Sequence, residues 1–213
     1  MHLGSLTDLM TKLCHERDLL NVRAVCRDFN ELCEPIIYRF LVQDIQTRRH
    51  FHLHRAASSR RMNSILRLIE DGAPVTQKNA VGEIPLHIAS RNGYVAGVEA
   101  LIRCNKDIDV PTSHGWTALQ LAARYGHDEV IVIFLRNGAD PDIHGFHGWT
   151  ALHYATRAGH RKAVELLVGA GARIDILDND QISPIHLAQT AGQCEILEIF
   201  NAAVSCTIYN EYQ

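Results

Sequence analysis

The chain contains nearly the same fourteen residues twice, HGWTALQLAARYGH at residues 114–127 and HGWTALHYATRAGH at residues 147–160. The second copy begins 33 residues after the first. Repetition at a fixed period of this size is typical of proteins in which one structural unit stacks on copies of itself. The period therefore predicts a repeat architecture.

The same period runs through most of the chain, because an apolar residue recurs every 33 residues and an alanine follows it three positions later. The apolar residues are Leu53, Leu86, Leu119, Leu152 and Ile185, and the alanines are Ala56, Ala89, Ala122, Ala155 and Ala188. A glycine stands four residues after the alanine in the last four copies, at 93, 126, 159 and 192, whereas the first copy has Arg60 there. Five copies are therefore expected.

Each copy reads as two short helices. In the fourth, Thr150 is an N-capping type of residue before a helical stretch that Gly159 can end. A second amphipathic stretch runs from about His160 to Val168, and glycines at 169 and 171 follow it. Two helices of this length cannot enclose a core, so each pair must bury its apolar face against its neighbours. The sequence predicts an all-α solenoid of five helix-turn-helix repeats over residues 46–213.

These copies resemble a known family. Residues 82–89, GEIPLHIA, and residues 183–188, SPIHLA, follow the pattern G-x-T-P-L-H-x-A of the ankyrin repeat. The resemblance covers about residues 50 to 213. It implies antiparallel helix pairs with hairpin-like fingers that project to one side.

Composition is that of a folded globular chain, with 46% hydrophobic and 21% charged residues among 213. The longest apolar run, residues 130–135, is far shorter than the roughly 20 residues that cross a bilayer. The six cysteines form no C-x-x-C pair, so we expect reduced thiols and a cytoplasmic or nuclear location. The mild excess of basic residues around residues 48–61 is too sparse to indicate a nucleic-acid partner, and no membrane signal is visible, so we expect neither partner.

Histidines are the only candidates for chemistry. His87, His153 and His186 share one slot of the repeat, where Gln120 stands in the third copy. A glutamine in this slot fits hydrogen bonding to the backbone better than metal ligation. Weaker metal candidates are His50, His52, His54, His144 and His147. No phosphate-binding loop or nucleophile motif occurs, so we expect no catalysis, metal or cofactor, with a histidine metalloenzyme as the outlying alternative.

Residues 1–45 differ from the repeats and are predicted to form a separate small helical module. The stretch 18–29, DLLNVRAVCRDF, resembles the F-box pattern D-L-x-x-x-x-x-V-C-[KR]-x-[WF] over residues 6–41, although the family's opening L-P-x-E is replaced by residues 1–4, MHLG. The resemblance implies binding of a Skp adaptor of a cullin ubiquitin ligase. The residues implied are Leu9, Leu13, Leu19, Val22, Val25, Cys26, Phe29 and Pro35. Alternatively, these helices only cap the first repeat.

Positions that repeat without being needed for packing are candidates for binding a client protein. Trp, Tyr and Arg predominate among them, as at interface hot spots. The candidates are Arg91, Tyr94, Trp116, Arg124, Tyr125, Phe146, Trp149 and Arg157. We expect Trp116 to stack beside Trp149, or each ring merely to cover a neighbouring helix. The predicted function is a non-catalytic substrate receptor of a ubiquitin ligase; a plain ankyrin scaffold is the alternative.

The last helix is predicted over about residues 193–204. Beyond it, we expect that the residues up to 213 either fold back onto the array or mark the natural truncation of a longer one.

Overall fold

The computed structural model describes residues 53–70, 72–105 and 107–211, with side chains through residue 204. All of these residues lie within one unit, Arg49–Gln213. The module predicted for residues 1–45, with all eight of its adaptor-binding candidates, lies outside the described residues, as do His50 and His52.

Five pairs of helices follow one another along the described chain. The first helices of the pairs are residues 53–58, α5 (Pro85–Arg91), α7 (Ala118–Tyr125), α9 (Ala151–Ala158) and α11 (Pro184–Thr190). The second helices are α4 (Met62–Glu70), α6 (Val95–Cys104), α8 (Asp128–Arg136), α10 (Arg161–Gly169) and α12 (Cys194–Glu211). A short 3-10 turn, η1 (Phe146–Gly148), lies between α8 and α9. Since these residues contain no strand, the predicted all-α solenoid of five repeats is confirmed.

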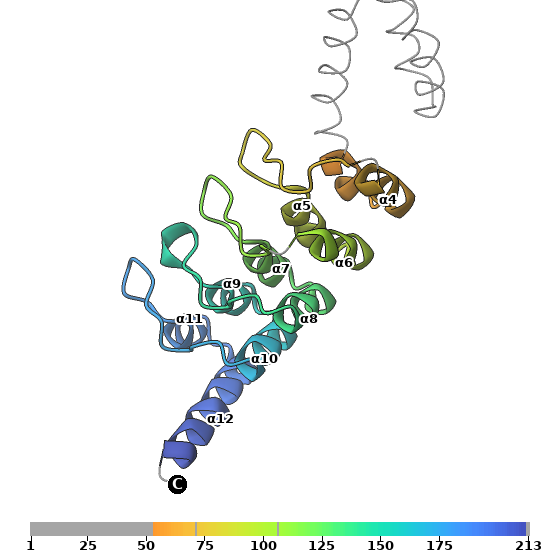
Figure 1. The fold of residues 1–213 in the computed structure, drawn as a ribbon. Coiled ribbons are helices and arrows are strands. Elements are labelled where there is room, and N and C mark those ends of the chain that lie inside the picture. Colours follow the sequence, from red (N-terminus) through yellow and green to blue (C-terminus); the bar gives the residue numbers. More distant parts are fainter. Residues whose placement is uncertain (1–52, 71, 106, 212–213) are drawn as a thin grey trace, which may run out of the picture. The chain divides into compact units, whose positions relative to one another are not determined.

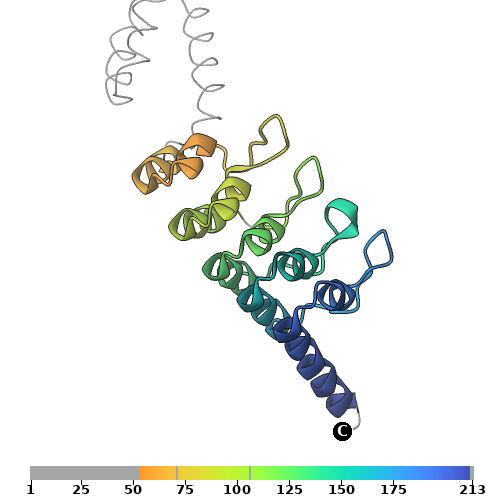
Figure 2. The ribbon, with the colours of Figure 1, turned by 180° about the vertical axis from the view of Figure 1, so that it is seen from behind.

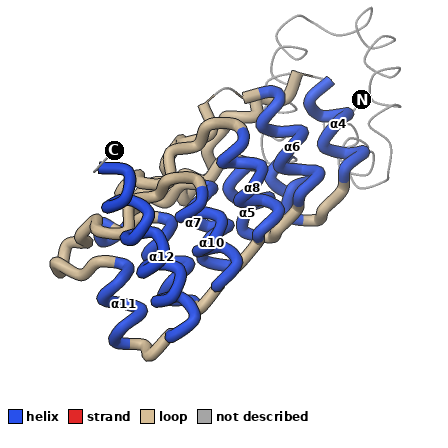
Figure 3. The backbone as a smooth tube through the Cα atoms, turned by 90° about the horizontal axis from the view of Figure 1, so that it is seen from below, coloured by secondary structure: helices blue, strands red, loops and turns tan. Residues whose placement is uncertain are grey.

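The helices form two rows (Figures 1 and 2). One row contains the first helices, with α5 packed on α7, α7 on α9 and α9 on α11, and the other contains α4, α6, α8, α10 and α12 in the same order. A loop leaves the end of each second helix, projects to one side and returns to the next first helix (Figures 1 and 3). We call these loops the fingers: residues 72–84, 107–117, 137–150 and 170–183.

The recurring leucines form the core between repeats. Leu53, Leu86, Leu119 and Leu152 are each at most 1% exposed. Ile185, at the same place in the last pair, is only partly buried. Burying such a side chain contributes about 1.5–3 kcal/mol, so each repeat gains stability by being covered on both sides.

Local signals set the ends of the first helices. Thr117 caps α7 by accepting the backbone N–H of Gln120, and the Gln120 side chain accepts the N–H of Thr117 in return. Gly126 ends α7 with φ 68°. Arg60, which replaces this glycine in the first repeat, has the same left-handed conformation, with φ 53°. The turn geometry is therefore imposed by packing even where the glycine is missing.

The last helix is longer than the sequence predicts. α12 continues to Glu211, beyond residue 204, so the backbone through residue 211 does not fold back onto the array. In the described part of the chain, no helix is both long enough and apolar enough to cross a membrane.

Candidate protein-interaction surface

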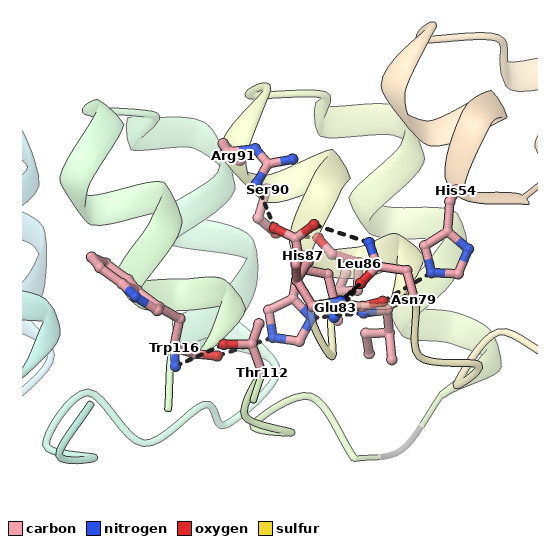
Figure 4. Close-up of polar contacts among 11 residues, drawn as sticks. His54, Asn79, Glu83, Leu86, His87, Ser90, Arg91, Thr112 and Trp116 are labelled. Atoms are coloured by element: carbon pink, nitrogen blue, oxygen red, sulfur yellow. Dashed lines mark hydrogen bonds and ion pairs between the residues drawn. The ribbon is translucent and has the colours of Figure 1, made fainter. Parts of the chain in front are cut away.

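A ladder of side chains ties each repeat to the finger of the next (Figure 4). His87, at the third position of α5, is fully buried. Its Nδ1 accepts the backbone N–H of Ile84 at 3.2 Å, so its proton is on Nε2, which donates to the carbonyl oxygen of Trp116 at 3.2 Å. One ring thus closes its own helix start and fastens the finger of the following repeat.

The same bond recurs between residues 29 apart along the array. His54 Nε2 lies 2.9 Å from the carbonyl oxygen of Glu83, and His153 Nε2 lies 3.1 Å from that of Ile182. In the third repeat the Gln120 amide takes over the role and donates to the carbonyl oxygens of Ile143 and Trp149 at 2.7 and 3.2 Å. The structural role predicted for this slot is confirmed by these bonds. His186, in the last described repeat, is exposed, and its Nδ1 lies 2.9 Å from Ser183 Oγ.

Burial keeps the inner histidines neutral. Desolvation lowers the pKa of His87 from 6.5 to about 4, although its bond to the carbonyl of Trp116 opposes the shift. The pKa of His153 is lowered for the same reason. Neutral rings with both nitrogens engaged are poorly placed for acid–base chemistry. Across the described ranges no three His, Cys, Asp or Glu residues gather as metal ligands would.

A second set of inter-repeat bonds was not foreseen from the sequence. His127 Nε2 lies 2.9 Å from the carbonyl oxygen of Arg91, and His160 Nε2 lies 3.1 Å from that of Arg124. Each ring fits against the glycine of the preceding repeat, where a Cβ at Gly126 would lie 2.8 Å from the His160 ring. In the sequence, the signal for these bonds is that a histidine directly follows the glycine in both copies, at positions 127 and 160.

Three aromatic rings make a continuous strip across the third and fourth repeats. Trp116 stacks on Tyr154 with ring centroids 4.3 Å apart. The centroid of Trp149 lies 5.0 Å from that of Tyr154, and the two rings are tilted by 52°. We call Trp116, Tyr154 and Trp149 the aromatic strip. The predicted direct stacking of the two tryptophans is wrong, because the Tyr154 ring contacts both of them.

The strip is held by polar bonds from the fingers. Tyr154 Oη donates to the carbonyl oxygen of Phe146 at 3.1 Å, and Trp149 Nε1 donates to Asp178 Oδ2 at 2.8 Å. Burial raises the pKa of Tyr154 to about 12, so its hydroxyl remains a donor. Each Trp ring is partly buried by these contacts. The rings are therefore both packing elements and part of the surface.

Arginines cover the two tryptophans. The Arg124 guanidinium lies 5.1 Å from the centroid of Trp116, and that of Arg157 lies 5.4 Å from Trp149. Arg91, at the same place in the second repeat, instead forms an ion pair with Glu83 (Figure 4). Five of the eight client-binding candidates, Arg91, Trp116, Arg124, Trp149 and Arg157, thus occupy equivalent places in three consecutive repeats.

The other three candidates are placed differently. Tyr125, 46% exposed at the end of α7, lies beside Arg124, with 5.9 Å between the guanidinium and the ring. Phe146, 43% exposed, lies in the finger before α9. Tyr94 packs against the core at the start of α6, and its ring occupies the space that a Cβ on Gly97 would need. Its hydroxyl is buried, with no hydrogen-bond partner among the described residues.

Tyr154 and Asp178 belong to the site but were missed by the sequence reasoning. The position of Tyr154 is occupied by Ile88 and Leu121 in preceding copies, so it reads as a core residue. Asp178 reads as a turn residue, and its contact with Trp149 joins residues 29 apart. Neither role had a signal in the local pattern.

Stacked helix pairs with fingers on one side define a class of helical repeat proteins that act by binding other proteins. The family model for ankyrin repeats (3 copies) matches residues 53–145 and 131–208. Together these matches cover more than half of the chain, and the chain belongs to the ankyrin repeat family. None of the curated proteins matches it. The family match lies outside residues 1–45.

Proposed function

We propose that this chain holds a client protein on the face formed by its fingers and first helices. Ankyrin repeats are a protein-interaction module, typically without catalytic activity. The observation that carries the proposal is the aromatic strip with its two arginines, because Trp, Tyr and Arg dominate interface hot spots. Exposed Tyr125 and Phe146 extend this face with apolar area.

The finer proposal is that the client is presented to a ubiquitin ligase. It is supported by the F-box-like stretch at residues 18–29, DLLNVRAVCRDF. Residues 1–45 would bind a Skp adaptor while the repeats bind the client. Tethering the two raises the effective concentration of the client's lysines near the conjugating enzyme. The chain itself would supply position and no chemistry.

Affinity capture with quantitative mass spectrometry tests client binding. A Tyr125→Ala, Phe146→Ala variant removes two exposed side chains from the proposed face, and we expect it to lose proteins that the parent captures. Leu66→Ala is a matched control, because Leu66 is 40% exposed but lies on α4 in the row of second helices. Equal loss in the control, or no loss in the double variant, would contradict this placement of the client.

Co-purification with the adaptor tests the finer proposal separately. The parent should capture a Skp adaptor, and Leu19→Ala or Phe29→Ala should reduce that capture while client binding persists. Deletion of residues 1–45 distinguishes the alternative: a recruiting module leaves the repeats as stable as before, whereas a cap leaves them less stable and less soluble. Absence of any adaptor from the parent's captured proteins would reject the ligase role alone.

A further inference from the structure

The arginine at the end of the first helix recurs in three repeats, but the residue beneath it changes. Arg91, Arg124 and Arg157 each stand eight positions after a residue at the base of the finger. That residue is Glu83 in the second repeat and a tryptophan in the third and fourth. The chain therefore satisfies the first guanidinium with its own carboxylate and supplies no such carboxylate at the next two positions.

The two later guanidinium groups have charge and donors to offer. Both Arg124 and Arg157 are exposed. Among the described residues neither forms an ion pair, and their contacts are with aromatic faces. A guanidinium stacked on a ring keeps its N–H edge available for a carboxylate, which it can bind through two parallel hydrogen bonds.

The support beneath these arginines is ordered before any partner binds. Tyr154 contacts both tryptophans, and Asp178 fixes the Trp149 indole from the next finger. A guanidinium stacked on a fixed ring loses less conformational freedom on binding than one on a mobile side chain. The pair is thus suited to recognise a ligand of matching charge and spacing.

Resting on the proposed client-binding function, we propose that Arg124 and Arg157 bind an extended acidic segment of the partner, with two carboxylates three residues apart. Packed helices lie about 8–10 Å apart, so equivalent side chains of the adjoining α7 and α9 are separated by about that distance. A polyproline II segment, with three residues per turn and about 3.1 Å per residue, presents residues i and i+3 on one side about 9 Å apart. The motif expected is Glu-x-x-Glu.

The surrounding charge favours a short acidic peptide over a nucleic acid. Residues 71–213 contain 10 Lys and Arg against 16 Asp and Glu. A nucleic acid is bound by broad basic surfaces that neutralise many phosphates. An array of net negative charge repels a polyanion more strongly than a short segment whose only charges are the two carboxylates that Arg124 and Arg157 can bind.

Selection from a displayed library of random 12-residue peptides, followed by fluorescence anisotropy of the selected peptides, tests the proposal. We expect enrichment of two acidic residues separated by two positions. Replacing both acids by glutamine should weaken binding to the unmodified protein by about tenfold or more. The Arg124→Gln, Arg157→Gln variant should lose the same factor, while Arg124→Lys, Arg157→Lys should recover only part of it, because lysine lacks the planar fork.

Arg103→Gln, Arg136→Gln is the matched control, because it removes the same two charges from exposed residues at the ends of α6 and α8, in the row of second helices, and it should bind the peptides as the parent does. The proposal fails if acids are not enriched, if the glutamine peptides bind equally well, if only phosphorylated versions bind, or if nothing is selected. The affinity capture described above judges client binding independently. Clients retained by the Arg124→Gln, Arg157→Gln variant would reject the acidic segment and leave the proposed function standing.

Discussion

At the scale of single residues, the third repeat shows how one substitution requires another. Its ladder position contains Gln120 in place of histidine, and the longer amide reaches two carbonyl oxygens of the next finger. Gly145 leaves room for it: a Cβ there would lie 2.3 Å from Gln120 Oε1. The residues that correspond to Gly145 in the other three fingers are Asn79, Thr112 and Asp178. In each of these cases, the ladder position of the repeat before the finger contains histidine instead of glutamine.

We therefore predict that Gly145→Ala lowers the free energy of unfolding by about 1–3 kcal/mol, since the amide must move or break its bonds. Gln120→His should relieve this loss in the double variant, because a histidine can donate to the Trp149 carbonyl as His87 does to Trp116. Urea denaturation of the four members of this double-mutant cycle measures the coupling. Additive losses would show that Gln120 and Gly145 do not depend on each other.

Buried His87 predicts a dependence of stability on pH. Its pKa is about 4 in the folded chain and 6.5 when exposed, so the unfolded state binds more protons between these values. The contribution is fully present above pH 6.5 and is lost as the pH falls toward 4, by about 3 kcal/mol in total. Lowered pKa values at both His87 and His153 add in the same direction.

Urea titrations at several pH values from 7.5 to 4.5 check this dependence, and NMR titration of the His87 ring checks its origin. The ring resonances should remain those of the neutral form, with Nε2 protonated, down to about pH 5. A His87 signal that titrates near pH 6.5 in the folded protein would contradict the buried, bonded ring. A flat stability profile would show that other groups offset it.

At the scale of elements, a side chain at the turn closes the first and the last of the four fingers. Asn79 Oδ1 accepts the backbone N–H groups of Val81 and Glu83, and Asp178 Oδ1 accepts those of Asp180 and Ile182. Asp178 also reaches back through Oδ2 to the indole of Trp149. This last bond makes the final finger a support for the strip on the preceding repeat.

Asp178→Ala should therefore lower stability by about 2–4 kcal/mol, because it leaves three donors without their acceptor. Asp178→Asn should cost about 1 kcal/mol, since its Oδ1 can still close the turn as Asn79 does while the amide cannot accept the Trp149 N–H. Chemical denaturation gives the losses, and tryptophan fluorescence reports the Trp149 environment. If the two variants behave alike, the bond to Trp149 does not contribute.

At the scale of the whole array, stability depends on being covered on both sides. Leu119 in an inner repeat is 1% exposed, whereas Ile185 at the equivalent place in the last repeat is only partly buried. The helices of each repeat pack against those of its immediate neighbours. The same substitution should therefore change the free energy of unfolding by different amounts at equivalent positions of inner and outer repeats.

Leu119→Ala should cost about 2–5 kcal/mol and Ile185→Ala less than about 2 kcal/mol, because the cavity left at Ile185 already borders solvent. Equilibrium unfolding measures both losses. Amide exchange should show the same gradient, with α7 and α9 protected more than α11. Equal losses at the two positions would mean that α11 is covered by something other than the described neighbours.

The sequence alone determined the period, the five repeats and the positions of their helices, because a 33-residue recurrence of leucine, alanine and glycine leaves few other ways to bury the apolar faces. The same recurrence singled out the two tryptophans and the arginines at 91, 124 and 157, although it could not show that the tryptophan rings also pack against Tyr154. The F-box-like module and the client-binding assignments remain predictions.

Only the tertiary structure decided which of those residues act together. Tyr154 reads as one more core residue, yet it contacts both tryptophans, and Asp178 reads as a turn residue, yet it orients Trp149 from 29 positions away. Such contacts join one repeat to the next. Their geometry depends on how the repeats stack, so a pattern confined to one repeat cannot specify it.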